Sequence, residues 1–312
     1  MDIFLKSISG ILVILGMILV GFVIGEKGWF DDKSRGLIAK LVTQIALPCY
    51  MLYTITQRFT AADLLKMLPA LRFPALSMVI LLGIATAVAR IFAVRQDRRG
   101  LFISMFFNSN TIFVGLPINQ ALFGDDSIPY VLIYYMCNTT FFWTLGTYLI
   151  QRDGEGEARF DLKTSLKKVF SPPLMGFLLG LVLVMLQIKL PAFLASDLQY
   201  LGNLTTPLSM IFIGLSVSHV GVKQLVLGKE QLLILLGRFL VAPLLMASIV
   251  YWVPLPSLMK QVFIIQSAMP VMTNAPVVAR LYGADSDYAA VMVTETTLAT
   301  MVVIPILMLL MA

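Results

Sequence analysis

Residues Leu101–Phe123 read LFISMFFNSNTIFVGLPINQALF, an apolar stretch long enough to cross a bilayer. Four polar residues, Asn108 to Thr111, lie in its middle and are followed by Gly115 and Pro117. Within lipid every backbone N–H and C=O group must be satisfied, so a polar, proline-containing break survives only where it lines a cavity enclosed by protein. The stretch therefore predicts a membrane helix that is interrupted at a functional site.

A second stretch of the same kind covers Leu258–Tyr282. Broken helices at corresponding places in two halves of a chain are the best sequence indication of a transporter's binding site. Alternatively, the polar side chains hold helices together or cap proline kinks, at about 0.6 kcal/mol each. We expect the substrate where the two stretches cross, and the candidate binding residues are Asn108, Asn110, Thr111, Pro117, Pro270, Thr273, Asn274 and Pro276.

The composition is that of a helical membrane protein with many spans. Hydrophobic residues make up 59% of the 312 residues and charged residues 13%, against about 25% charged in soluble domains. The sequence predicts an all-α integral membrane protein with a retained first helix and ten transmembrane helices, at about 8–25, 36–57, 68–92, 101–122, 128–150, 172–189, 198–219, 230–253, 258–280 and 287–311. The net charge of +6 fits basic loops between spans, so no nucleic-acid partner is expected.

The two halves of the chain repeat each other. A shift of 159 residues aligns Gly21 with Gly180, and it aligns the prolines Pro117 and Pro276. We expect a first five-helix repeat at 1–150, a basic cytoplasmic linker at 151–170 and a second repeat at 171–312. Because five is odd, the second repeat is inverted in the membrane. This 5+5 inverted repeat, with broken, crossing helices four and nine, is typical of secondary transporters.

Lysine and arginine predict the orientation. Sixteen of them lie in or beside the loops after the odd-numbered spans, and six lie on the other side. The positive-inside rule places the first group in the cytoplasm, which leaves both termini outside the cytoplasmic (inner) membrane. The linker at 151–170 could also bind membrane lipid or serve regulation.

Two charged residues fall within expected spans, Arg238 in the eighth and Glu295 in the tenth. A charge at mid-helix costs about 2.5–3.5 kcal/mol on insertion scales, so such residues face a cavity or pair with each other. Glu295 could carry a coupling proton and Arg238 could attract an anion, or the two could form a structural pair. Gln44 and Asn203 each precede a proline by four residues, where they support the site or cap a kink.

Other reactive residues predict no cofactor and no metal site. Cys49 and Cys137 lie inside apolar spans and His219 lies at a helix end. The acidic pairs Asp31-Asp32 and Asp125-Asp126 resemble those with which membrane-embedded prenyl transferases hold Mg²⁺-diphosphate. The expected topology puts the two pairs on opposite sides of the membrane, so we do not expect an enzyme.

The ten-span length, the segments NSNTIFVGLP and AMPVMTNAPVVARLYGAD and the LP of the second span resemble the auxin efflux carrier family. That family joins plant auxin exporters to bacterial permeases for malate, malonate and related acids. The resemblance implies a scaffold domain from helices 1, 2, 6 and 7, which usually dimerises, and a mobile transport domain from helices 3, 4, 5, 8, 9 and 10. Asn110 matches the asparagine beside the first crossover and Pro270 matches the proline of the second, whereas Ser109 stands where plant members have proline. The short linker fits the bacterial branch.

These observations predict a secondary transporter for a small organic anion, a di- or monocarboxylate. The resemblance implies an acid such as malate or malonate and an elevator-type movement. Exposed carbonyl groups at half-helix ends can hold Na⁺, so sodium coupling is an alternative to proton coupling at Glu295. A membrane receptor that senses a ligand in the same pocket is a third possibility, although the chain contains no segment that resembles an output domain.

Overall fold

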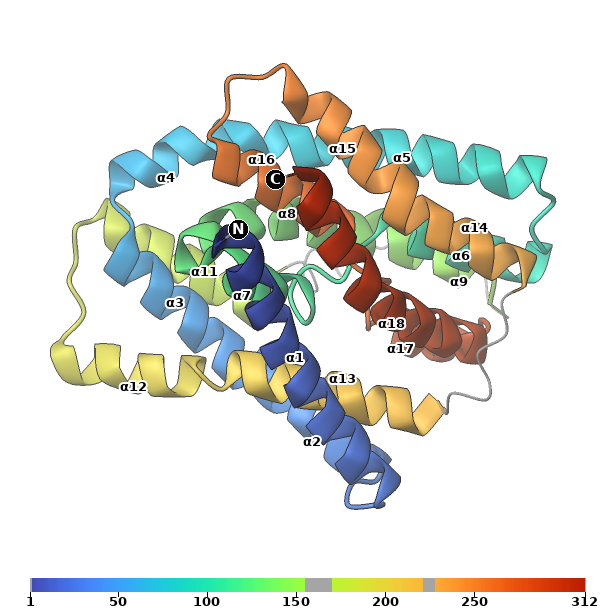
Figure 1. Cartoon of the computed structure of the whole chain (residues 1–312), viewed down its shortest axis with the longest axis horizontal. Helices are drawn as coiled ribbons and strands as arrows, with labels where there is room; N and C mark the ends of the chain where they lie inside the picture. The colour runs from blue at the N-terminus through green and yellow to red at the C-terminus, as the bar shows by residue number, and fades with distance from the viewer. Residues whose placement is uncertain (1, 155–169, 221–227, 312) are drawn as a thin grey trace. The chain divides into compact units, whose positions relative to one another are not determined.

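The computed structural model describes residues 2–154, 170–220 and 228–311, and the described residues form helices and no strand (Figure 1). Among the described residues, five helices are long and apolar enough to cross a membrane, namely Lys33–Arg58, Ala61–Ile91, Ala192–His219, Lys229–Tyr251 and Ser286–Met311. Two shorter apolar helices cover Leu12–Glu26 and Pro172–Met185. The prediction of an all-helical membrane protein is therefore confirmed, and the arrangement as ten spans in two inverted repeats stays a prediction.

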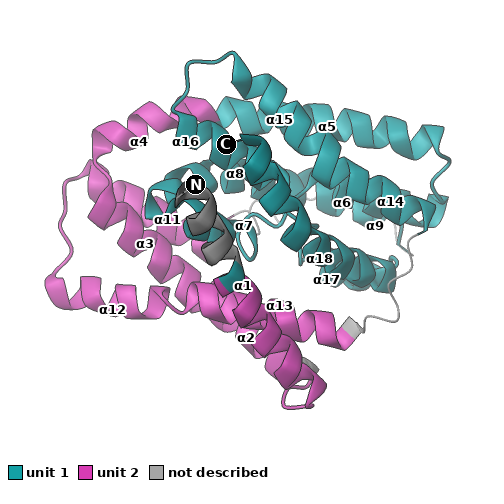
Figure 2. Ribbon diagram, in the orientation of Figure 1, with its two compact units in different colours: residues 1–12, 71–166, 220–312 teal, residues 13–70, 167–219 magenta. Residues whose placement is uncertain are grey.

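The chain divides into two compact units, each built from both halves of the sequence (Figure 2). Unit 1 comprises residues 1–12, 71–166 and 220–312, and unit 2 comprises residues 13–70 and 167–219. Unit 2 thus contains most of the expected spans one, two, six and seven, and unit 1 contains the other six. Their roles as scaffold and transport domain stay predictions. Of the expected linker at 151–170, residues 155–169 lie outside the described residues.

Unit 2 contains the helices α1 (Asp2–Glu26, from residue 13), α2 (Asp32–Leu41), α3 (Leu47–Arg58), α4 (Ala61–Met67), α11 (Pro172–Met185), α12 (Ala192–Gly202) and α13 (Thr205–Val220). The third expected span begins earlier than residue 68 because Thr60 and Asp63 form a capping box at the start of α4. The seventh is split by a turn after Gly202 into α12 and α13.

Glycines allow close approach of the helices in unit 2. A Cβ atom added to Gly21 on α1 would lie 2.3 Å from the carbonyl oxygen of Ile211 on α13. The residue that the sequence repeat aligns with Gly21 is Gly180 on α11, and a Cβ atom there would lie 3.1 Å from Cβ of Ile55 on α3. Small residues at such crossings favour association because membrane helices gain most from tight packing. Each half of the sequence therefore supplies one helix with a glycine that packs on a helix of the other half.

Unit 1 contains α5 (Arg72–Ile91), α6 (Arg99–Phe107), α7 (Gly115–Phe123), α8 (Ile128–Phe141), α9 (Thr147–Arg152), α14 (Lys229–Leu236), α15 (Ala242–Tyr251), α16 (Ser257–Ser267), α17 (Ala275–Tyr282) and α18 (Ser286–Met311). Its core is built largely from aliphatic and aromatic side chains of α5, α6 and α18. The two sequence stretches that predict a break are interrupted between α6 and α7 and between α16 and α17.

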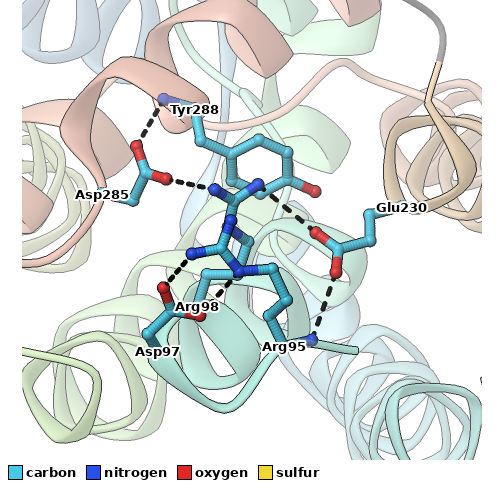
Figure 3. A network of polar contacts seen from close by, with 6 residues as sticks. All are labelled: Arg95, Asp97, Arg98, Glu230, Asp285 and Tyr288. Atoms are coloured by element: carbon cyan, nitrogen blue, oxygen red, sulfur yellow. Dashed lines mark hydrogen bonds and ion pairs between the residues drawn. The ribbon is translucent and has the colours of Figure 1, made fainter. Parts of the chain in front are cut away.

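A polar network joins three helix starts of unit 1 (Figure 3). Arg98, just before α6, lies 2.7 Å from a carboxylate oxygen of Asp285 and 3.5 Å from one of Glu230. Its guanidinium carbon lies 4.5 Å from the ring centre of Tyr288. Arg95 pairs with Asp97, and this hydrogen bond lowers the pKa of the Asp97 carboxyl. The network thus connects the starts of α6, α14 and α18.

Replacing Arg98 by alanine is expected to destabilise the protein by about 1–3 kcal/mol, because half-buried Asp285 loses a charged hydrogen-bond partner and half-buried Glu230 loses an ion-pair partner. Thermal unfolding of the detergent-solubilised protein measures the effect. Arg95→Ala is the matched control, because Arg95 and Asp97 are 60% and 56% exposed and exposed pairs contribute little. Equal melting temperatures for the two variants would contradict a stabilising role of Arg98.

Candidate functional site

The two interrupted helices meet in unit 1 through their backbones. Ser109 and Val271 form an antiparallel bridge, and the N–H of Asn110 donates to the carbonyl oxygen of Pro270 at 2.8 Å. Residues 108–114 and 268–274 are thus non-helical segments between half-helices, and they pair around Ser109 and Val271 before each turns into its second half-helix. We call these two paired segments the crossing. The extended backbone leaves polar groups that no helix satisfies, and buried groups of this kind need partners.

Side chains of neighbouring helices supply those partners. The Asn138 side chain on α8 accepts a hydrogen bond from the N–H of Ser109 at 2.9 Å and donates one to its carbonyl oxygen at 2.7 Å. On α18, the hydroxyl oxygen of Thr296 accepts from the N–H of Val271 at 3.0 Å. Asn138 and Thr296 are both 0% exposed. The bridging pair is therefore held on each side by one polar side chain, and neither of them was predicted from the sequence.

Asn110 links the two interruptions through its side chain as well as its backbone. Its Nδ2 donates to Oγ1 of Thr273 at 2.6 Å, and its Oδ1 accepts from the N–H of Phe113 at 3.1 Å. The second bond closes the turn that leads into α7. These contacts of Asn110 join the two interrupted helices, as the alternative to a binding role expects. A role of Asn110 in substrate binding stays a prediction.

The other predicted binding residues lie in or next to the same interruptions. Asn108 is buried and donates to the carbonyl oxygen of Ser104 at 3.2 Å, while its Oδ1 has no hydrogen-bond partner among the described residues. The carbonyl oxygen of Thr111 accepts from Nε2 of Gln266 at 3.3 Å. Asn274 is the N-cap residue of α17 and makes no side-chain capping bond. Pro117 and Pro276 lie in the first turns of α7 and α17.

Arg238 binds the ends of two half-helices. Its Nη1 donates to the carbonyl oxygen of Phe106 near the end of α6 at 3.1 Å, and its Nη2 donates to that of Ser267, the last residue of α16, at 2.6 Å. Nε and Nη2 both donate to Met269, at 3.1 and 3.0 Å. The side chain is 0% exposed. Its hydrogen bonds thus go to carbonyl oxygens, and an ion pair with Glu295 is not among them.

The N-terminal ends of the half-helices differ in whether a side chain caps them. At the start of α6, the Asp153 carboxylate accepts from the N–H groups of Gly100 and Leu101 at 2.9 and 2.6 Å. Burial raises the pKa of the Asp153 carboxyl above its usual value, and these two hydrogen bonds offset only part of that rise. The starts of α7 and α17, which adjoin the crossing, have no side-chain cap. The partial positive charge of those two helix starts is therefore not offset by a capping side chain.

Glu295 lies on α18 beside Thr296, the residue that binds the crossing. It is 7% exposed, and neither of its carboxylate oxygens has a hydrogen-bond partner among the described residues. The structural pair with Arg238, which the sequence left open, does not form. A buried carboxylate without a partner is costly in its charged form, and such groups mark proton relays in membrane proteins.

Gln44 and Asn203 belong to unit 2, not to the unit that contains the crossing. Gln44 is exposed in a π-helical turn at Val42–Ala46, just before Pro48, and Asn203 is the exposed C-cap residue of α12. Whether they support the site or cap kinks stays a prediction. Asp31 of the first acidic pair caps α2, and Asp125 of the second accepts from Gln120 at 2.8 Å.

Two further amides of unit 1 lie close to the crossing. Gln266 and Asn119 are both 0% exposed. Asn119 donates to the carbonyl oxygen of Gly115 at 2.7 Å, and a Cβ atom added to Gly115 would lie 2.4 Å from Oε1 of Gln266. Asn108 stands out in the sequence because an amide is costly inside an apolar span. The same criterion, applied to every span, also identifies Asn119, Asn138 and Gln266.

Comparison with known proteins decides the family. Residues 7–308 match the family described as membrane transport protein. The chain belongs to this family, that of the auxin efflux carriers. It is similar to an uncharacterized transporter of Methanocaldococcus jannaschii, 27% identical over 299 residues that cover 94% of this chain and 95% of the relative.

The chain is also similar to an uncharacterized transporter of Methanothermobacter thermautotrophicus. The two are 26% identical over 312 residues, which cover 97% of this chain and 98% of the relative. The predicted resemblance is thereby confirmed. The chain is a multi-pass membrane transporter, and its family indicates transport and not an enzymatic reaction.

Proposed function

We propose that this chain carries a small organic anion, a di- or monocarboxylate such as malate or malonate, across the cytoplasmic membrane by an elevator-type movement. The observation that carries the proposal is the asymmetry of the helix ends at the crossing. Arg238 binds carbonyl groups at the ends of α6 and α16, whereas the starts of α7 and α17 have no side-chain cap.

The charges at the crossing favour an anion. Each helix end carries a partial charge of about half an elementary charge, negative at the C-terminus and positive at the N-terminus. The guanidinium group offsets the two negative ends, which leaves two positive helix starts without a counter-charge. Backbone N–H groups at a helix start bind carboxylates and phosphates. A carboxylate also matches the neutral amide of Asn274, which can donate hydrogen bonds.

The division into two units supports the elevator-type movement. All residues of the crossing and their side-chain partners belong to unit 1. In this proposal unit 1 carries the substrate and unit 2, as the scaffold, dimerises with a second copy. The choice of malate or malonate comes from the resemblance to bacterial permeases.

Coupling to protons is the form of transport that the site favours. An inside-negative potential drives an anion outward by about 2.3 kcal/mol per net charge per 100 mV, so uptake needs co-transported cations. Glu295, buried and without a hydrogen-bond partner, is the candidate proton carrier. Sodium coupling is less favoured because Arg238 already binds the carbonyl groups that end α6 and α16. Ligand binding without flux in liposomes would instead favour a receptor.

Thermal unfolding of the purified protein with a panel of organic acids tests the proposal. A ligand at about 100 times its Kd stabilises the native state by about 2.7 kcal/mol. We expect malate, malonate or a close relative to raise the melting temperature, and we expect Asn274→Ala to lose this response. Asn110→Ala is expected to lose it too, but that change also removes the bonds to Thr273 and Phe113.

Asn203→Ala is the matched control, since it removes an exposed amide at a helix end of unit 2. This variant is expected to respond to the acid as the native protein does. If no carboxylate raises the melting temperature, or if Asn274→Ala responds fully, the crossing is not the binding site for an organic acid.

A further inference from the structure

Arg238 is the largest fully buried side chain of the described residues, and its position depends on a local irregularity of its helix. Residues Gly237–Val241 form a π-helical turn between α14 and α15. Such turns add a residue to a helix, change the direction of side chains and are frequent at functional sites. The preceding Gly237 lies so close to α6 that an added Cβ atom would be 2.3 Å from the ring of Phe106. The backbone thereby approaches α6 closely enough for the guanidinium group to reach both helix ends.

The hydrogen bonds of Arg238 match the charge of what they bind. Its three nitrogens make four bonds, to the carbonyl oxygens of Phe106, Ser267 and Met269. Two helix C-termini carry about −0.5 charge each, so together they match the single positive charge of the guanidinium. The planar group presents several N–H donors in fixed directions, which an ammonium group does not.

We propose that Arg238 is a built-in counter-cation of the crossing: it holds the C-terminal ends of α6 and α16 together and does there what a bound metal cation would otherwise do, so that this carrier needs no sodium at those carbonyl groups. Arg238 is then a positioning residue and not a ligand of the substrate. The part of this inference that concerns substrate rests on the proposed function, whereas the part that concerns the helix ends does not.

The first experiment asks whether a free cation replaces the missing side chain. Arg238→Ala is expected to melt at a lower temperature than the native protein, because four hydrogen bonds and a charge are lost. Methylguanidinium chloride, kept below denaturing concentrations, is expected to raise the melting temperature of Arg238→Ala by at least about 2 °C relative to choline chloride at equal ionic strength. The native protein is expected to show no such rise.

Phe142→Ala is the matched control, since it also opens a cavity in the core of unit 1 but removes no charge. Methylguanidinium is not expected to stabilise it. If Arg238→Ala melts like the native protein, or if methylguanidinium acts on Phe142→Ala as strongly as on Arg238→Ala, the counter-cation proposal is wrong.

A second pair of variants covers the case that Arg238→Ala does not fold. Arg238→Lys keeps the charge and Arg238→Met keeps an unbranched apolar side chain without it. The proposal requires Arg238→Lys to be the more stable of the two. The reverse order would overturn it, because the free energy lost by burying the charge would then exceed the free energy gained from its attraction to the two helix C-termini.

The last experiment separates this inference from the proposed function. Thermal stabilisation of the native protein by malonate is measured in sodium chloride and in sodium-free choline chloride, and we expect equal shifts. A shift that appears only with sodium overturns the counter-cation proposal and leaves carboxylate transport standing. If malonate and the other acids have no effect in either salt, the proposed function fails, and the methylguanidinium experiment still decides the role of Arg238.

Discussion

Asn138→Leu is expected to destabilise the native protein by about 2–6 kcal/mol, since each of two buried backbone groups left without a partner costs about 1–3 kcal/mol. Asn138 alone supplies side-chain hydrogen bonds to both the N–H and the carbonyl group of Ser109 among the described contacts. Leucine has a similar size, so the change removes hydrogen bonds and little packing. Thermal unfolding of the purified protein measures the loss, and flux into liposomes is expected to fall to background because the crossing is no longer held in place.

Thr140→Val on the same helix is the matched control. The Thr140 hydroxyl donates to the carbonyl oxygen of Met136 within α8, and the side chain is exposed. This variant is expected to unfold and to transport like the native protein. An Asn138→Leu variant with a native melting temperature would show that the side chain does not hold the crossing.

Glu295→Gln is expected to abolish uptake driven by a pH gradient and to leave substrate exchange intact. Glutamine keeps the size and polarity of the side chain but cannot carry a proton. One pH unit supplies about 1.4 kcal/mol per proton, which corresponds to about tenfold accumulation of substrate by a carrier that couples one proton to net charge-neutral transport. Liposomes with an acidic exterior are expected to show that accumulation with the native protein and none with the variant.

Asp287→Asn is the matched control, because Asp287 lies in the first turn of the same helix and is exposed. We expect it to leave both gradient-driven uptake and exchange unchanged. Glu295→Gln that still accumulates substrate under a pH gradient would exclude Glu295 as the proton carrier. Replacing the pH gradient by a sodium gradient then tests the sodium-coupled alternative directly.

The sequence locates the crossing better than it explains how the crossing is held. Asn108 to Thr111 and Pro270 to Pro276 mark interruptions because polar groups and prolines do not persist in a lipid-facing helix. The predicted repeat could have indicated the polar side chains that hold the crossing. A shift of 159 residues aligns Asn138 with Thr297. Thr297 is the neighbour of Thr296, which binds the N–H of Val271. The two halves of the sequence therefore place a polar side chain that binds the crossing at nearly the same position of the predicted repeat.

The partners of Arg238 could not be predicted from the sequence. A charged residue in an apolar span predicts a cavity or a charged partner, and Glu295 was the obvious partner in the second half. The observed partners are backbone carbonyl groups of Phe106, Ser267 and Met269. Every residue has a carbonyl group, so no residue type indicates which ones a side chain will reach. That choice depends on the π-helical turn at Gly237–Val241 and on the close approach of Gly237 to Phe106.

The bridge between Ser109 and Val271 has a consequence for the speed of transport. The bridge, the bond from Asn110 to Pro270 and the contacts of Asn138, Thr296 and Arg238 all join residues of unit 1. A displacement of unit 1 as one body breaks none of them, so their enthalpy cancels between the resting and the displaced states. If the proposed elevator-type movement holds, the activation energy of a transport cycle comes from interactions other than these hydrogen bonds, those with the surrounding lipid among them. Turnover is then expected to respond more to bilayer composition than to the strength of these hydrogen bonds.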